Sequence, residues 1–258
     1  MKAAEISIHI TKWLKEYSHQ SNTNGFVVGI SGGIDSAVTS TLCALTGKNV
    51  LCLLLPIHQN QTEFDRSSEH AEWLNNRFPN VTIETTNLSD TFDMLTKQIP
   101  GELQSDLTMA NTRARLRMTT LYTYAGAKRM LVAGTGNKVE DFGVGFFTKY
   151  GDGGVDISPI ADLMKSEVFA LANELGIVDS IQTAVPTDGL WADGRSDEDQ
   201  LGASYDELEW AMKEYSISTE NNFEGRQQEV FSIYTRLHRN NLHKMRAIPV
   251  CLIPENLK

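Results

Sequence analysis

The stretch GISGGIDSAV, Gly29 to Val38, concentrates small residues between an apolar run and the start of an expected helix. Glycines let the backbone approach a ligand closely, and a helix N-terminus adds about half a positive charge. The hydroxyls of Ser31 and Ser36 can donate hydrogen bonds to phosphate oxygens. This turn is therefore predicted to bind phosphate without a cationic side chain of its own.

The loop differs from other phosphate-binding loops. No Gly-Lys-[Ser/Thr] follows it, and Gly29, Gly32 and Gly33 lack the spacing of the dinucleotide-binding fingerprint. Asp35 would repel a bare phosphate, so a carboxylate at this position indicates a cation between the two, with Mg²⁺ the natural choice. The alternative is a simple strand-to-helix turn in which Asp35 caps the helix.

The string Ser31-Gly32-Gly33-Ile34-Asp35-Ser36 resembles the pyrophosphate loop of the N-type ATP pyrophosphatases. Ile34 and Ala37 stand where some relatives carry polar residues, but both can face the packing between helix and sheet. Members of that superfamily cut ATP between the α and β phosphates. The resemblance implies that the loop holds the departing pyrophosphate while a substrate oxygen is adenylated.

The surrounding pattern alternates strands and helices. Short apolar runs predict buried strands at 25–30 and 50–56, and two further strands are expected at 81–86 and 130–135. Helices are expected at 6–17, from the glycine loop through about Leu45, and at 63–78, 101–129, 165–175, 205–215 and 223–242. This order predicts an α/β fold, a doubly wound parallel sheet in a single domain spanning 1–258. Ligands bind such sheets at the carboxyl ends of strands, where the turns after Ile30 and Ala133 should meet in one site.

Four further segments narrow the function. They are GTGNKVEDFGVGFFTKYGDGG, VPTDGLWADGRSDEDQLG, NTRARLRM and LHKMRAIP. Together they resemble the ammonia-dependent NAD synthetases, in that family's order and across most of the chain. The resemblance implies that ATP adenylates the nicotinate carboxylate of deamido-NAD and that ammonia then displaces AMP to form NAD. Mg²⁺ would neutralise the charge that develops on the phosphates.

The same resemblance assigns roles to individual residues. The ATP-binding set is Gly29, Ile30, Ser31, Gly32, Gly33, Ile34, Asp35, Ser36, Thr135, Lys165 and Thr187. The deamido-NAD set is Arg115, Lys149, Asp156, His243 and Lys244. Asp35 and Glu140 would bind Mg²⁺, and Asp35 and Lys165 are the expected catalytic residues.

On the residues alone, each assignment has an ordinary alternative. Arg115, Lys149 and Lys165 could be surface charges. Glu140 could begin a helix, Asp156 could cap a turn, and His243 could stabilise a helix C-terminus. The acids Asp197, Glu198 and Asp199 are expected to form a solvated helix start with no metal role. The rings of Phe146 and Phe147 are expected to pack in the core or in a lid and not to form a platform that stacks on nicotinate.

Composition excludes several classes of partner. The formal net charge of −10 disfavours nucleic acid and anionic membranes. With 41% apolar residues and no run of 18 of them, the chain is expected to be a globular cytoplasmic protein. Cys43, Cys52 and Cys251 form no motif, so we expect reduced thiols. Hydrolysis of glutamine would need a further domain with a nucleophilic cysteine, and these three have no catalytic context, so free ammonia is the expected nitrogen donor. The family resemblance also implies a homodimer.

Other readings stay open at this stage. A synthetase domain that aminates xanthosine monophosphate would share the loop but should lack GFFTKYGDGG. A tRNA-thiolating relative would favour basic patches and paired cysteines. A non-catalytic nucleotide-binding module would have little use for both candidate Mg²⁺ carboxylates. The irregular segments 143–154 and 187–202 are interpreted as loops that close over the site and exclude water.

Overall fold

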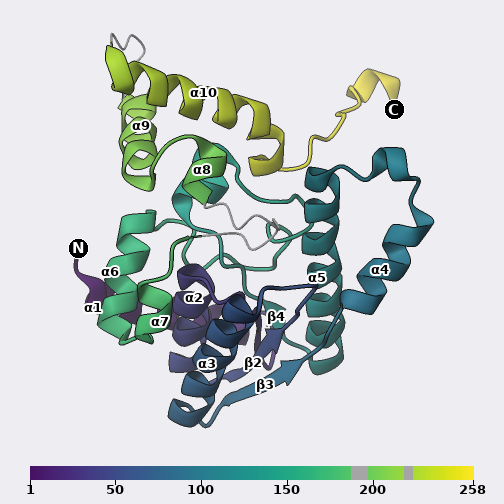
Figure 1. Ribbon diagram of the computed structural model, residues 1–258, viewed down its shortest axis with the longest axis vertical. Coiled ribbons are helices and arrows are strands. Elements are labelled where there is room, and N and C mark those ends of the chain that lie inside the picture. Colours follow the sequence, from purple (N-terminus) through teal and green to yellow (C-terminus); the bar gives the residue numbers. More distant parts are fainter. Residues whose placement is uncertain (187–196, 218–222) are drawn as a thin grey trace.

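The computed structural model of the chain describes residues 1–186, 197–217 and 223–258. Its centre is a parallel sheet with the strand order β3-β2-β1-β4 (Figure 1). The strands are β1 (Gly25–Gly29), β2 (Asn49–Leu54), β3 (Val81–Thr85) and β4 (Leu131–Val132). Beyond β4, Ala133 forms a parallel bridge with Ile157, which brings the two segments together at the carboxyl end of the sheet.

Helices cover both faces of this sheet because its two central strands, β1 and β2, are apolar on both sides. Phe26 and Val28 of β1 pack into one buried cluster, and Val27 between them packs into another. The first cluster contains residues of α1 (Ala3–Gln20), α2 (Ile34–Leu45), α3 (Gln61–Arg77) and α6 (Lys165–Leu175). The second contains residues of α4 (Ser89–Gln98) and α5 (Asp106–Lys128). This arrangement confirms the predicted doubly wound α/β fold.

A third buried cluster lies outside the two sheet faces. It joins η2 (Val139–Val144, a π-helix) to α8 (Asp197–Leu201), α9 (Tyr205–Ile217) and α10 (Gly225–Met245). In Figure 1 these last three helices form their own layer at the top of the view. The short helix α7 (Asp179–Gln182) packs with α2, α3 and α6, and η3 (Glu255–Leu257) ends the chain.

Element boundaries differ from the expectations in specific places. The region 101–129 is divided into η1 (Gly101–Leu103) and α5, because Ser105 caps α5 by accepting a hydrogen bond from the backbone N–H of Thr108. The helix α4 was not expected, and Phe92 is its one buried residue. Within the run 130–135, the strand β4 is only Leu131–Val132, and the backbone N–H of Ala133 adds one more hydrogen bond to β1, to the carbonyl oxygen of Val27.

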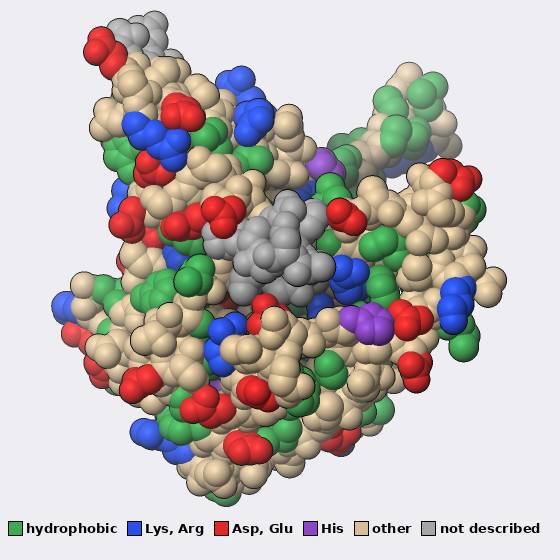
Figure 2. All heavy atoms as spheres, in the orientation of Figure 1, with side chains coloured by type: hydrophobic (Ala, Val, Ile, Leu, Met, Phe, Trp, Pro, Cys, Tyr) green, Lys and Arg blue, Asp and Glu red, His purple; other side chains and the backbone are tan. Residues whose placement is uncertain are grey.

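The described surface fits the acidic composition. On the face shown in Figure 2, acidic and basic side chains are interspersed, and the described residues form no continuous basic area there. Across 1–186, 197–217 and 223–258, no helix combines the length and apolarity needed to cross a membrane.

Candidate active site

The glycine loop connects β1 to α2 and is held in shape by its own serines. Ser36 Oγ donates to the carbonyl oxygen of Gly33 at 2.9 Å, and it lies 3.1 Å from Ser31 Oγ. The backbone N–H of Gly33 donates to Ser31 Oγ at 3.2 Å. Gly33 is also the N-cap of α2, without a side-chain cap. No side chain caps the backbone N–H groups at the start of α2, so the loop leaves this helix N-terminus open to an anion.

Asp35 does not cap α2. Its carboxylate points away from the helix end and accepts from Lys165 Nζ at 2.6 Å through Oδ2. The same ammonium group donates to Glu140 Oε1 at 3.0 Å. The Lys165 side chain is 4% exposed, and those of Asp35 and Glu140 are 16% and 15% exposed. Three residues from α2, η2 and α6 thus meet as one nearly buried ion cluster.

Two neutral groups hold the carboxylates in place. Asn137 Nδ2 donates to Asp35 Oδ1 at 3.0 Å, while its Oδ1 accepts from the backbone N–H groups of Val139 and Glu140. The hydroxyl of Tyr205, on α9, donates to Glu140 Oε1 at 2.5 Å, and its ring lies 4.7 Å from Lys165 Nζ. Sequence reasoning missed both residues; an asparagine before an acidic helical turn was the only available signal.

The charges in this cluster are strongly coupled. Burial holds the pKa of Asp35 above its ordinary value, although the Lys165 ammonium opposes this. Burial also acts to raise the pKa of Glu140, but Lys165 and the Tyr205 hydroxyl outweigh it and lower that pKa overall. Burial acts to lower the pKa of Lys165, and the two carboxylates more than reverse that effect. Lys165 is therefore a permanent cation between two acids.

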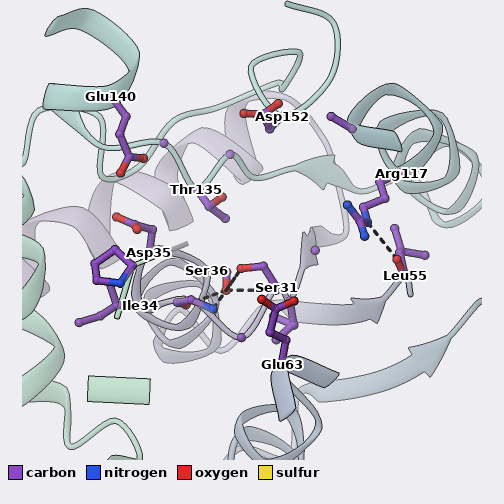
Figure 3. A pocket seen from close by; sticks show the side chains of 18 of the residues that line it. Ser31, Ile34, Asp35, Ser36, Leu55, Glu63, Arg117, Thr135, Glu140 and Asp152 are labelled. Carbon is purple, nitrogen blue, oxygen red and sulfur yellow. Dashed lines mark hydrogen bonds between the residues drawn. The ribbon is translucent and has the colours of Figure 1, made fainter. Parts of the chain in front are cut away.

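These residues line one cavity of about 270 Å³. All of the predicted ATP residues from Gly29 to Ser36, with Thr135, Glu140 and Lys165, contribute to its wall. Figure 3 shows Thr135, Asp35 and Glu140 on one side of this space and the serines of the loop below. Thr187 lies outside the described residues. The predicted meeting of the turns after Ile30 and Ala133 is thereby confirmed.

The predicted deamido-NAD residues gather beside this cavity. Arg115 Nε donates to the carbonyl oxygen of Lys149 at 3.2 Å, and Lys149 Nζ donates to that of His243 at 2.8 Å. Lys149 and Lys244 line a second pocket. This pocket shares Met118 and Val155 with the first, so the two adjoin.

Asp156 has different surroundings from the other four residues of this set. Its Oδ2 accepts from the backbone N–H of Val132 at 2.8 Å, and its Oδ1 accepts from the Tyr122 hydroxyl at 2.9 Å. Asp156 therefore ties its loop to β4 and α5. Tyr122 lines the second pocket, so Asp156 is connected to that pocket by its hydrogen bond with Tyr122.

Two expectations about irregular segments need comment. Asp197 begins α8, as expected, but it is not solvated: it is 5% exposed, and its Oδ2 lies 3.1 Å from the Tyr205 hydroxyl oxygen. The segment 143–154 is tied to α10, since His238, Asn241 and Lys244 donate to carbonyl oxygens of Gly143, Val144 and Phe147, respectively. Of the expected second loop, 187–196 lies outside the described residues.

The chain is similar to known proteins in both sequence and structure. Residues 6–248 match the family model described as NAD synthase. An NH3-dependent NAD+ synthetase from Carboxydothermus hydrogenoformans is 36% identical over 249 residues, covering 95% of this chain and 96% of the relative. A solved NMN synthetase from Francisella tularensis has a TM-score of 0.83 at 31% identity, covering 99% of each chain. An NH3-dependent NAD synthetase from Campylobacter jejuni, in complex with a nitrate ion, has a TM-score of 0.80 at 26% identity, covering 98% of this chain and 100% of that one.

Proposed function

The chain belongs to the NAD synthase family, and from this premise we propose that it amidates deamido-NAD with ammonia, consuming ATP and releasing NAD, AMP and pyrophosphate. One observation carries the proposal. The cavity lined by the glycine loop, Asp35, Glu140 and Lys165 adjoins the pocket lined by Lys149 and Lys244. Two anionic substrates can therefore meet between two sets of positive groups and backbone donors.

The reaction needs two displacements. In the first, an oxygen of the nicotinate carboxylate bonds to the α-phosphorus, and the bond to the bridging oxygen breaks so that pyrophosphate leaves. In the second, the ammonia nitrogen bonds to the activated carbon, AMP leaves with the electron pair of the C–O bond, and the nitrogen loses a proton. The loop N–H groups and Lys165 face the phosphates and oppose the charge that gathers there.

Asp35 and Glu140 fit a role in holding Mg²⁺. Mg²⁺ is commonly bound by one or two carboxylates together with substrate phosphates, and these two carboxylates lie close enough to share the Lys165 ammonium beside the loop. Within the described residues no three acids, histidines or cysteines gather into a complete metal site. Bound Mg²⁺ would supply charge neutralisation on the phosphates, with Lys165 released to contact them.

Ammonia is the proposed nitrogen donor because the described cysteines do not resemble a glutamine-hydrolysing nucleophile. Burial raises the pKa of Cys52 to about 12, and it also raises the pKa of Cys43. Both thiols therefore stay protonated and unreactive. Cys251 is exposed in the segment after α10, away from the cavity lining.

A second substrate is favoured by one comparison. The relative from Francisella tularensis is named an NMN synthetase and matches this chain over 99% of its length. The acid that corresponds to NMN carries the same nicotinate carboxylate but lacks the adenylyl half of deamido-NAD. The glycine loop chemistry would be unchanged, and only the second pocket would distinguish the two acids.

The test is pyrophosphate release by the purified protein with ATP, Mg²⁺ and ammonium, supplied with either acid. We expect faster release with deamido-NAD, with NAD as the product, and no stimulation by glutamine in place of ammonium. Preference for the mononucleotide acid would redirect the assignment to NMN synthesis. Release with neither acid, but with xanthosine monophosphate, would overturn both.

A homodimer is proposed on the family resemblance. The segment after α10 extends away from the body in Figure 1, and its side chains Ile248, Val250 and Leu252 are 66%, 75% and 84% exposed. A second copy would shield such apolar side chains from water. Light scattering of the full chain tests the proposal; a monomer mass at micromolar concentration would contradict it.

A further inference from the structure

The proposed ATP cavity is short of available positive charge. Its described lining contains six acidic side chains, from Asp35, Glu63, Glu140, Asp141, Asp152 and Asp197. Burial raises the pKa of Asp141 to about 8, so the other five supply most of the negative charge at neutral pH. It contains three cationic side chains, from Arg66, Arg117 and Lys165. A triphosphate carries several negative charges, so every cation that can turn toward it matters for binding.

Two of these cations already have partners. Lys165 is shared between Asp35 and Glu140 at 2.6 and 3.0 Å. Arg117 Nε donates to the carbonyl oxygen of Leu55 at 3.0 Å, a contact drawn in Figure 3. Arg66, on α3, differs from both.

Arg66 is a cation with an unused donor. Its Nε is buried and has no hydrogen-bond partner, and no ion pair to its guanidinium occurs among the described residues. A buried donor without a partner costs about 1–3 kcal/mol, so native proteins rarely leave one unless a ligand or water completes it. The cavity that Arg66 lines is where such a ligand would bind.

The backbone brings Arg66 to the glycine loop. Gly32 has a φ of +86°, and a Cβ added there would lie 2.8 Å from the carbonyl oxygen of Glu63 and 3.2 Å from the backbone nitrogen of Ser67. The loop and α3 can approach this closely only because residue 32 is glycine. The Cβ of Arg66 lies 3.5 Å from the same point. Its side chain therefore starts beside the phosphate-binding backbone.

We propose that Arg66 binds the ATP phosphates and stabilises the pyrophosphate as it leaves. Arg66 supplies, from a separate helix, the cation that this loop lacks within its own sequence. As the bond between the α-phosphorus and the bridging oxygen breaks, the electron pair goes to the pyrophosphate. A guanidinium can donate two parallel hydrogen bonds to the oxygens on which this charge gathers. This role for Arg66 rests on the proposed function, because it requires that the bound nucleotide is ATP.

Calorimetric titration of the full chain tests the proposal without any acyl substrate. The ligands are MgATP, magnesium pyrophosphate and adenosine, and the variant is Arg66→Gln. We expect MgATP and pyrophosphate to bind roughly ten- to a hundredfold more weakly, as for one lost charge-assisted hydrogen-bonding group. Adenosine, which has no phosphate, should bind within about twofold of its affinity for the unmodified protein.

Matched variants decide between a phosphate ligand and a merely structural residue. Arg77→Gln removes a guanidinium from the same helix, where it lies over the Trp73 ring at 5.2 Å, and should leave all three affinities unchanged. Arg66→Lys keeps the charge but loses the paired hydrogen bonds, so its pyrophosphate affinity should fall between that of the unmodified protein and that of Arg66→Gln. It also carries the test if Arg66→Gln does not fold.

Two results would overturn the inference. One is pyrophosphate binding by Arg66→Gln as tight as that of the unmodified protein. The other is an equal loss of adenosine and pyrophosphate affinity, which would make Arg66 a residue of the pocket's shape only. Neither depends on amidation, so a failure of the proposed substrate assignment would appear separately, in the assay of the unmodified protein with deamido-NAD.

Discussion

Lys165 Nζ lies 2.6 Å from Asp35 Oδ2, although 130 positions separate the two residues in the chain. The contact joins the first residue of α6 to the second residue of α2, across the carboxyl end of the sheet. Because Lys165 also contacts Glu140, one ammonium group balances two acids that would otherwise repel each other. The cluster therefore contributes both to the site and to the fold.

Replacing Lys165 by methionine should destabilise the protein. The change leaves two nearly buried carboxylates without their cation, which typically costs about 3–5 kcal/mol. The free energy of unfolding, measured by urea denaturation at neutral pH, should fall by that order. The loss should shrink in mildly acidic solution, because protonation relieves the remaining repulsion.

Lys138→Met is the matched control for this change. Lys138 Nζ also contacts a carboxylate, Asp162 at 2.8 Å, but the Asp162 side chain is 96% exposed. An exposed pair contributes at most about 1 kcal/mol. Equal stability of the Lys165→Met and Lys138→Met proteins would show that the buried cluster does not support the fold.

Asp35→Asn should nearly abolish pyrophosphate release while preserving the loop. The amide keeps the shape and can still accept from Asn137, but it loses the charge that holds Lys165 and the proposed Mg²⁺. We expect a fall in rate of roughly a hundredfold or more, as when a single charge-stabilising group is removed from other enzymes. The assay is release with saturating ATP and deamido-NAD, with Asp162→Asn as the exposed control. A rate within a few-fold of the unmodified protein would remove Asp35 from the catalytic residues.

The sequence predicts the loop and the sheet well because both depend on local pattern. Gly29 to Ser36 combine turn-forming and helix-starting residues in one stretch, and β1 and β2 consist almost wholly of apolar residues. The contacts of Tyr205 and Arg66 could not be predicted in this way. A tyrosine at a helix start and an arginine on an amphipathic helix are ordinary residues until the packing of α9 and α3 brings them to the cavity.

Tyr205→Phe should raise the Mg²⁺ concentration needed for half-maximal activity. The variant keeps the ring beside Lys165 but removes the hydroxyl that orients Glu140. A hydrogen bond to a charged group is worth about 1.5–3 kcal/mol, so an increase of roughly tenfold is expected, with a smaller effect on the maximal rate. Activity is measured across a Mg²⁺ series at saturating ATP.

A second buried tyrosine provides the comparison. Tyr234 belongs to the same apolar cluster and packs against the rings of Tyr215 and His238. Tyr234→Phe should leave the Mg²⁺ requirement unchanged. If both variants lower the melting temperature equally and neither changes the Mg²⁺ requirement, Tyr205 is a packing residue only.

His70 should make the protein less stable in acid. It is fully buried between α3 and α2, and burial lowers its pKa from 6.5 to about 4. Ser40 Oγ donates to the carbonyl oxygen of Ser36 and lies 3.0 Å from His70 Nε2. His70 Nδ1 is buried and has no hydrogen-bond partner, so a proton added there would find no acceptor, and neutral His70 is the form that fits. The unfolded chain binds a proton at higher pH than the folded one. The stabilisation is therefore complete above pH 6.5 and lost as the pH falls toward 4.

The expected loss from this histidine between neutral pH and roughly pH 5 is about 2 kcal/mol in the free energy of unfolding. His70→Gln keeps a donor to Ser40 but cannot titrate, so its stability should vary less over this range. His58→Gln is the control, because His58 pairs with Asp93 at the surface, where its side chain is 55% exposed. Parallel stability curves for the unmodified protein and His70→Gln would contradict the prediction, because a histidine that is buried in its neutral form must contribute a slope of this sign whatever the other groups do.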